Sequence, residues 1–306
     1  MNKKHTAKIV IHKQFILGAF TGIIFLLLGS VVAIAILHVS KTQTISVHPV
    51  LETHRTVAKS LPDEFKKQLA VASASAIYRV PILMYHYVEN VQNKQDKLRL
   101  ELNIPPNVFE QQVKTLSDAG YTFMTAKALG QVIDGKKQLP KNPVLLTFDD
   151  GHWDFATIVL PILEKYHAKA TTYVISGFIG GSDFMTAQEL QDVIKSGIVD
   201  VGAHTVHHIS LRGRPKSDVQ YEIDQSKATL EQDYHIQVVS FAYPDGRFDQ
   251  QAIQILQNDH FTTAVSTAPG IEQSQTNKYF LYRLRPSYRT GQSLLTWLSQ
   301  DQFSAY

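Results

Sequence analysis

Short apolar runs alternate with amphipathic stretches along the chain from about Arg79 onward. Six runs have the length and residue types of buried strands, namely Val80–Tyr85, Val144–Phe148, Thr171–Ile175, Val199–Ala203, Val238–Tyr243 and Thr262–Ser266. Between two of them, Phe109, Val113 and Leu116 share one face of a helix predicted to end before Gly120. This alternation predicts an α/β fold with a largely parallel sheet or a (β/α) barrel, rather than a β-sandwich.

The longest apolar run lies near the start of the chain, where Phe15 to Leu37 form 23 residues without a charged side chain. About 20 apolar residues suffice to cross a bilayer as a helix. Four lysines precede the run, so the positive-inside rule places the amino terminus in the cytoplasm and everything after His38 outside. We expect an uncleaved signal anchor. The alternative, a long signal peptide that is removed, would also export the rest of the chain.

These patterns divide the chain into four parts. We predict a cytoplasmic basic tail over 1–14, a transmembrane signal anchor over 15–38, an extracellular spacer over 39–78 and a catalytic domain over 79–306. The spacer is polar and aperiodic, with a short helix expected where Phe65, Leu69 and Ala72 recur at helical spacing. The predicted location is therefore the cell membrane, with a single pass and an extracellular catalytic domain.

The composition narrows the classes of function. Hydrophobic residues make up 44% of the chain and charged residues only 19%, which is typical of a packed globule. The net charge of +3 arises from the lysines of the amino-terminal tail, which argues against a nucleic-acid partner. The chain has no cysteine, so disulfides, thiolate nucleophiles and cysteine-ligated zinc are excluded. Any metal site must use His, Asp or Glu.

Residues with catalytic chemistry follow the predicted strands. They are His86; Asp149 and Asp150; His204 and His208; Pro244, Asp245 and Gly246; and, in the last apolar segment, Arg283 and Arg285. Active sites of parallel α/β folds gather at the carboxyl ends of the strands. We therefore expect these side chains to converge.

Adjacent carboxylates at Asp149 and Asp150 repel each other unless a cation lies nearby or one is protonated. A pair of helix N-cap residues is the alternative. The spacing of His204 and His208 suits two imidazoles on one metal, although either could be an ordinary core histidine and His207 lies between them. Two histidines and one aspartate leave positions open for water and substrate, as in catalytic zinc sites, and predict hydrolysis.

Three segments carry a specific resemblance. They are Thr147-Phe148-Asp149-Asp150-Gly151, His204-Thr205-Val206-His207-His208 and Phe241-Ala242-Tyr243-Pro244-Asp245-Gly246. In order and spacing they resemble the first three motifs of the polysaccharide deacetylase family (NodB homology domain, carbohydrate esterase family 4). The early segment Pro81-Ile82-Leu83-Met84-Tyr85-His86 resembles the branch that acts on exported poly-N-acetylglucosamine, as in biofilm polysaccharide deacetylases. The resemblance implies a distorted (β/α) barrel of the NodB type.

The resemblance also implies roles for individual residues. Asp149 would be the general base, and Asp150, His204 and His208 would bind one divalent metal, with zinc as the default among several acceptable ions. The oxyanion would be stabilised at Tyr243, Pro244, Asp245 and Gly246, through the backbone N–H of Asp245.

The third motif departs from the family pattern, which often has Arg at the position of Ala242 and Tyr at that of Asp245. Arg283 resembles the arginine that related enzymes place near the catalytic aspartate, and a surface ion pair is the alternative for it. The late histidine that serves as general acid in the family is missing, which leaves His86 as the best substitute, and a structural histidine in a Tyr-rich segment is the alternative for it. Trp153 is a candidate for stacking on a sugar ring, or for plain core packing.

The leading hypothesis is a metal-dependent hydrolase that removes N-acetyl groups from N-acetylglucosamine units of a cell-surface polysaccharide, either poly-N-acetylglucosamine or peptidoglycan. The alternative is a membrane-tethered glycan-binding or scaffold protein with an impaired deacetylase fold. Retention of Asp149 argues against that alternative, because a binder needs no free carboxylate beside the metal. A serine hydrolase is disfavoured because the chain lacks a Gly-x-Ser-x-Gly elbow.

Overall fold

The computed structural model describes residues 76–300, and all structural statements below concern them. The predicted basic tail and signal anchor, and the helix expected in the spacer, lie outside the described residues. Within residues 76–300, no helix combines the length and the apolar character needed to cross a bilayer.

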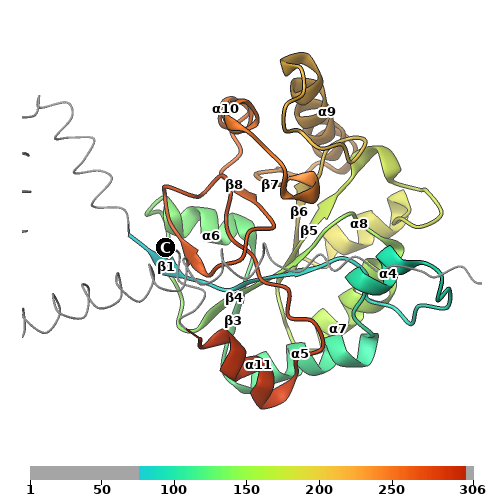
Figure 1. Cartoon of the computed structure of the whole chain (residues 1–306), viewed down its shortest axis with the longest axis vertical. Helices are drawn as coiled ribbons and strands as arrows, with labels where there is room; N and C mark the ends of the chain where they lie inside the picture. The colour runs from blue at the N-terminus through green and yellow to red at the C-terminus, as the bar shows by residue number, and fades with distance from the viewer. Residues whose placement is uncertain (1–75, 301–306) are drawn as a thin grey trace, which may run out of the picture. The chain divides into compact units, whose positions relative to one another are not determined.

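A seven-stranded parallel sheet forms the centre of the domain, with the strand order β2-β4-β5-β6-β7-β8 and with β3 paired to β4 (Figure 1). Its strands are β2 (Ile82–Tyr85), β3 (Thr122–Met124), β4 (Pro143–Phe148), β5 (Ala170–Val174), β6 (Val199–Ala203), β7 (Ser240–Ala242) and β8 (Thr263–Val265). A separate antiparallel pair joins β1 (Tyr78–Arg79) to β9 (Glu272–Gln273).

The two edges of the main sheet are linked by residues 281–284. Leu281 forms a parallel bridge with Val265 of β8, and Leu284 forms one with Leu83 of β2. The N–H of Leu281 donates to the carbonyl of Ala264 and that of Leu284 to the carbonyl of Ile82, both at 2.8 Å. The predicted parallel α/β architecture is confirmed, as a curled sheet whose edges are bridged by an irregular segment.

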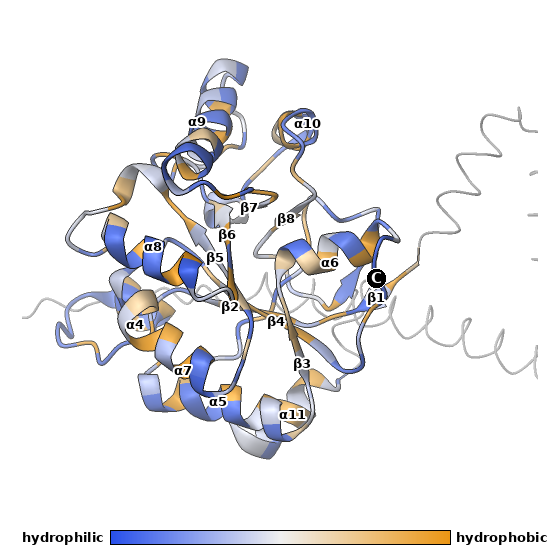
Figure 2. Ribbon diagram, turned by 180° about the vertical axis from the view of Figure 1, so that it is seen from behind, coloured by the Kyte–Doolittle hydropathy of each residue, from blue (hydrophilic) through white to orange (hydrophobic). Residues whose placement is uncertain are grey.

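Helices surround this sheet (Figure 1). They are α4 (Lys97–Leu102), α5 (Pro106–Asp118), α6 (Ala126–Ile133), α7 (Leu160–Lys165), α8 (Ala187–Lys195), α9 (Lys216–Tyr234), α10 (Gln250–Asn258) and α11 (Gly291–Leu298), with short turns η1 (Phe155–Val159), η2 (Ser176–Phe178) and η3 (Pro244–Gly246). Figure 2 shows hydrophobic residues concentrated along the central strands, while the helices carry polar residues on their outer faces. The helix predicted to end before Gly120 is confirmed as α5.

The strands are buried on both faces, as parallel strands covered by helices require. Successive residues alternate between two clusters: Leu83 and Leu146 pack under the outer helices, whereas Ile82 and Leu145 face the interior, which α6 fills. Tyr173 also lies inside, directly opposite Gly202 on the next strand. A β-carbon at Gly202 would come within 2.5 Å of the Tyr173 ring, so glycine is what allows this tyrosine to fill the interior.

The six predicted strands agree with the observed ones to within two residues at each end, and the difference in length is largest at β7. The prediction covered Val238–Tyr243, whereas β7 has only three residues. The carbonyl of Val239 accepts hydrogen bonds from both Thr262 and Thr263, so the ladder is irregular there. Strands β1, β3 and β9 were not predicted, because runs of two or three residues carry too little periodicity.

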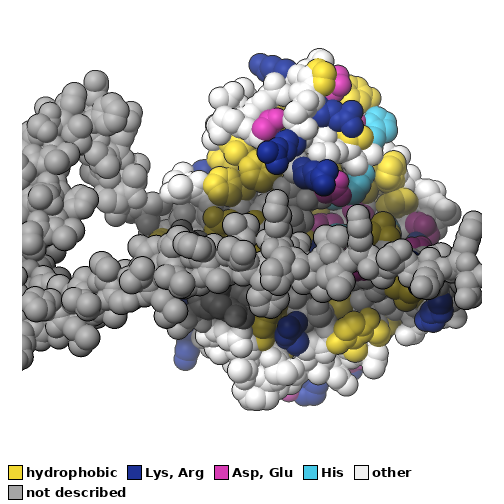
Figure 3. All heavy atoms as spheres, in the orientation of Figure 1, with side chains coloured by type: hydrophobic (Ala, Val, Ile, Leu, Met, Phe, Trp, Pro, Cys, Tyr) yellow, Lys and Arg dark blue, Asp and Glu magenta, His cyan; other side chains and the backbone are white. Residues whose placement is uncertain are grey.

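The visible face of the molecule carries mixed side chains. In Figure 3, basic, acidic and apolar groups of the described residues are interspersed over this face, and no single charge dominates the part of it that is not grey.

Candidate metal centre and active site

Parallel pairing brings the predicted site residues to one end of the sheet. Tyr85 of β2 pairs with Phe148 of β4, which places His86 beside Asp149. Ala203 of β6 pairs with Phe241 of β7, which places His204 beside Ala242. The register of the paired strands thus brings together residues that are far apart in sequence, as expected at the carboxyl ends of parallel strands.

Asp150, His204 and His208 converge on one point. The Oδ1 atom of Asp150 lies 3.3 Å from Nε2 of His204 and 3.4 Å from Nε2 of His208. One ligand atom from each of the three residues lies within 4.8 Å of the others. Ligand atoms of a tetrahedral zinc site lie about 3.3 Å apart, because the bonds to the metal are about 2.0–2.1 Å long. The spacing therefore fits a single small divalent cation.

The hydrogen bonds around these ligands leave the required lone pairs free. Nδ1 of His204 lies 2.7 Å from the carbonyl of Ala242, so Nδ1 carries the proton and Nε2 is left as an acceptor. The buried Oδ1 of Asp150 has no hydrogen-bond donor among residues 76–300. A buried carboxylate oxygen without a donor, facing two imidazole nitrogens, is the arrangement that a cation satisfies.

The other oxygen of Asp150 is held by His152, which the sequence did not single out. Nε2 of His152 lies 3.2 Å from Oδ2 of Asp150, and Nδ1 lies 3.1 Å from the carbonyl of Asp183. The His152 ring is stacked between Tyr87 and Phe184, with ring centroids 3.9 and 5.0 Å away. His152 therefore orients the Asp150 carboxylate so that Oδ1, rather than Oδ2, faces the two histidines.

Backbone strain is concentrated at this site. Asp150, Thr205, His208 and Asp245 have φ angles of 76°, 67°, 53° and 57°, in the left-handed region that residues other than glycine rarely adopt. Such conformations persist only where surrounding contacts impose them, and they cluster at functional sites. Three of the four residues line the active-site cavity described below.

Asp149 and Arg283 form a buried bidentate pair. Nη1 and Nη2 of Arg283 lie 2.7 Å from Oδ1 and Oδ2 of Asp149, and Nε of Arg283 donates to the carbonyl of Ser266. Burial by itself would raise the pKa of Asp149, but the charge and hydrogen bonds of Arg283 outweigh it and hold the pKa below its usual value. Asp149 is therefore ionised at neutral pH and lies outside the group of three metal-binding candidates.

His86 also lies beside Asp149, with Nε2 3.8 Å from Oδ2 of Asp149. Burial lowers the pKa of His86 to about 4, although Asp149 and Asp150 act in the opposite direction. The imidazole is therefore neutral at neutral pH. A proton accepted by Asp149 therefore has only a short distance to move to reach His86.

Only some of the remaining predicted site residues line the cavity that contains the metal-binding candidates. Tyr243 and Asp245 line the same cavity as the metal-binding candidates, whereas Pro244, Gly246 and Trp153 do not. The hydroxyl of Tyr243 donates to the carbonyl of Tyr279 at 2.9 Å, so it is held by the protein itself. Gly246 contacts Thr267 so closely that a β-carbon there would lie 2.1 Å from Oγ1, which accounts for the glycine.

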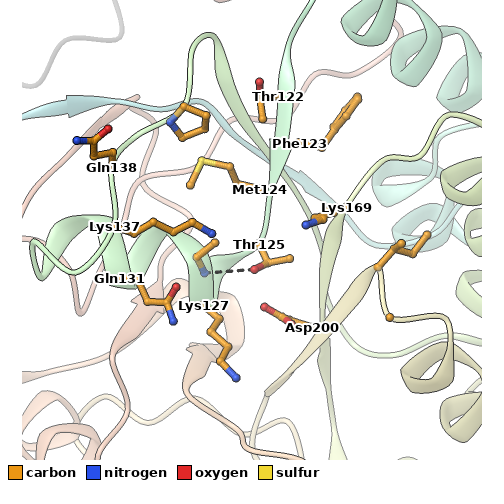
Figure 4. A pocket seen from close by; sticks show the side chains of 14 residues that line it. Thr122, Phe123, Met124, Thr125, Lys127, Gln131, Lys137, Gln138, Lys169 and Asp200 are labelled. Atoms are coloured by element: carbon orange, nitrogen blue, oxygen red, sulfur yellow. Dashed lines mark hydrogen bonds between the residues drawn. The ribbon is translucent and has the colours of Figure 1, made fainter.

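The cavity over the site has a volume of about 440 Å3. Its walls include Leu98 and Glu101 of α4, Phe178 and Phe184 from the loop before α8, and Arg285. A second cavity of similar volume lies near the amino ends of the strands and is lined by Lys127, Lys137 and Asp200 among others (Figure 4). None of the predicted catalytic or metal-binding residues lines that second cavity, so the chemistry belongs to the first.

Comparison with known proteins identifies the family of this chain. A family model described as polysaccharide deacetylase matches residues 136–264. YxkH of Bacillus subtilis (strain 168), which is named for the same family, is 30% identical over 209 residues, covering 68% of this chain and 72% of YxkH. The chain belongs to the polysaccharide deacetylase family. The enzyme interpretation of the motifs is thereby confirmed.

A further relative and a solved structure are also similar to this chain. The poly-beta-1,6-N-acetyl-D-glucosamine N-deacetylase of Staphylococcus aureus (strain MSSA476) is 23% identical over 195 residues, covering 60% of this chain and 67% of its own. The structure of the Streptococcus pyogenes deacetylase PplD in complex with acetate superimposes with a TM-score of 0.68 and 28% identity, covering 74% of this chain and all of PplD. The family resemblance found in the motifs thus extends through the described domain.

Proposed function

We propose that this deacetylase hydrolyses N-acetyl groups of N-acetylglucosamine units in a cell-surface polysaccharide, and that it depends on one divalent metal, with zinc as the default. The observation that carries the proposal is the convergence of Asp150 Oδ1 with the Nε2 atoms of His204 and His208, next to the ionised carboxylate of Asp149. Poly-β-1,6-N-acetylglucosamine is the first candidate substrate, because a relative is named for it. Peptidoglycan is the second.

Asp150, His204 and His208 would hold the metal. A divalent cation bound there lowers the pKa of water at the site and polarises the acetamide carbonyl. Asp149, kept ionised by Arg283, accepts the proton of the attacking water. The backbone N–H of Asp245 is the protein's own donor for the developing oxyanion. His86 relays the proton from Asp149 to the departing amine. Its imidazole is neutral, so it first takes up the proton from Asp149 and then donates a proton to the amine.

Acetate release from defined oligomers tests the proposed function. We expect the purified enzyme to release acetate from β-1,6-linked N-acetylglucosamine oligomers, to lose this activity after treatment with a chelator, and to regain it when zinc is added back. Parallel assays with β-1,4-linked oligomers and with peptidoglycan distinguish the substrates. Absence of acetate release from all three, with metal bound, would contradict the proposed reaction.

Replacing His86 by Gln tests the proton relay. The amine of an amide needs a proton to leave, whereas a nitrophenolate does not, so the loss should depend on the leaving group. We expect kcat to fall by about 10²-fold or more on an N-acetylated oligomer and by much less on 4-nitrophenyl acetate. Equal losses on both substrates would assign His86 to orientation of the site instead.

The signal anchor remains part of the proposal. We propose that residues 15–38 hold the protein in the cell membrane with the catalytic domain outside. Recovery of the full-length protein in carbonate-washed membranes, together with digestion of the domain by protease added to intact cells, is the expected result. Release of the protein into the medium would instead indicate cleavage of the apolar segment.

A further inference from the structure

The loop between His204 and His208 is held by a buried acidic residue of α9, the helix that follows this loop in the chain. Glu222 of α9 is only 4% exposed. Its Oε2 accepts hydrogen bonds from the backbone N–H groups of Val206 and His207 at 2.8 and 2.9 Å. Its Oε1 lies 2.7 Å from Nδ1 of His207. One carboxylate thus holds two successive N–H groups and one ring of the segment between the two metal-binding histidines.

The two histidines differ in what fixes them. His204 directly follows β6, and its ring is held by the carbonyl of Ala242. His208 lies four residues further on, in a loop whose residues Thr205 and His208 both have positive φ. Such conformations are unfavourable for residues other than glycine, so the position of His208 depends on contacts that hold the loop.

Those contacts come from two sides. On one side, the N–H groups of Ser176 and Gly177 donate to the carbonyls of Thr205 and Val206, each at 3.1 Å. On the other side, Glu222 binds the N–H groups of the same loop. The contacts from η2 involve only backbone atoms. Glu222 is therefore the side chain that binds the N–H groups of Val206 and His207.

We propose that Glu222 is a positioning residue that fixes His208 for metal binding, acting through the Val206 and His207 backbone. His207 is thereby assigned to the contacts that Glu222 makes and not to the metal, since its ring faces Glu222. This inference rests on the metal site of the proposed function. Residues that orient metal ligands typically change metal affinity by about 10–100-fold when they are removed.

Two substitutions of Glu222 distinguish a role that depends on the length of its side chain from one that depends on its negative charge. Glu222→Gln keeps the length of the side chain, so its oxygen can still accept both N–H groups and its amide can donate to His207. Glu222→Asp keeps the negative charge but is one methylene too short to reach the loop. A positioning role predicts that Glu222→Asp is the more damaging change, whereas a purely electrostatic role predicts the reverse.

Glu231 provides a matched control on the same helix. Its carboxylate accepts the N–H of Val238 at 2.9 Å and pairs with Lys227, so it also holds a loop, but one that contains no metal-binding candidate. Glu231→Asp and Glu231→Gln report the cost of losing a helix-to-loop contact without any effect on His208.

The experiment measures zinc affinity by competition with a chromophoric chelator, the visible spectrum of the cobalt-loaded protein, and thermal unfolding of the metal-free protein. We expect Glu222→Asp to weaken zinc binding by about 10–100-fold and to alter the cobalt spectrum. Glu222→Gln should stay within about tenfold of wild type, and the Glu231 variants should bind zinc much as wild type does.

Three results would overturn the inference: wild-type zinc affinity in Glu222→Asp, weaker binding by Glu222→Gln than by Glu222→Asp, or an equal loss in the Glu231 variants. Both Glu222 variants keep a polar group at this position, and the unfolding curves report whether they fold. If the wild-type protein itself bound no zinc, the proposed metal site would fail along with this inference. Failure confined to the Glu222 variants would leave the proposed function intact.

Discussion

Replacing Asp149 by Asn should reduce kcat/KM for an N-acetylated oligomer by about a hundredfold or more while the protein retains its metal. The amide cannot accept the proton of the attacking water, whereas the three proposed ligands are untouched. The rate is measured as acetate release, and metal content by mass spectrometry on the same sample.

The comparison is made well below the unfolding temperature, because Asn leaves the Arg283 guanidinium without its carboxylate. Asp200→Asn is a suitable control, since Asp200 lines the second cavity and not the active site. An Asp149→Asn enzyme with activity within tenfold of wild type, or one that has lost its metal, would contradict the division of roles between Asp149 and Asp150.

Replacing Arg283 by Met should have the largest effect on stability. Arg283 is 1% exposed, and its removal leaves the buried Asp149 carboxylate without a counter-charge. Breaking a buried ion pair on one side typically costs about 3–5 kcal/mol, so we expect a loss of that size in the free energy of unfolding in urea at pH 7. The double variant Arg283→Met/Asp149→Asn should recover part of it, because no buried charge is then left alone.

This loss should depend on pH. The pKa of Asp149 is lower in the folded protein than in the unfolded chain, so in the wild type the pair contributes stability above the unfolded pKa of about 4 and loses it as pH falls further. Without Arg283, burial raises the pKa of Asp149, and the carboxyl becomes neutral on mild acidification. The difference between wild type and variant should therefore be largest near pH 7 and shrink toward pH 4. A difference that is independent of pH would indicate lost packing rather than a lost charge pair.

The residues at the strand ends were predictable because two simple rules fix them. Apolar runs locate β4 and β6, and both strands pair in parallel with β5, so Asp149, Asp150 and His204 lie at the same end of the sheet. Spacing alone did not decide between His207 and His208, and only the family resemblance favoured His208. That choice depends on the positive φ at Thr205 and His208 and on Glu222, which comes from a separate helix.

Other parts of the site could not be predicted because they depend on packing between distant segments. His152 becomes a partner of Asp150 only when Tyr87 and Phe184, from different loops, enclose its ring. Trp153, its neighbour in sequence, does not line the cavity. The closeness of a residue to a motif in the sequence therefore did not predict whether that residue lines the cavity.

The central claim is that Asp150, His204 and His208 bind one cation. Crystals grown with zinc, measured at wavelengths on both sides of the zinc absorption edge, test it directly. We expect one anomalous peak about 2.0–2.2 Å from Asp150 Oδ1 and from Nε2 of both histidines, with the Asp149 carboxylate still bound to Arg283. Absence of a peak there, or a peak coordinated by Asp149 or His207, would contradict it.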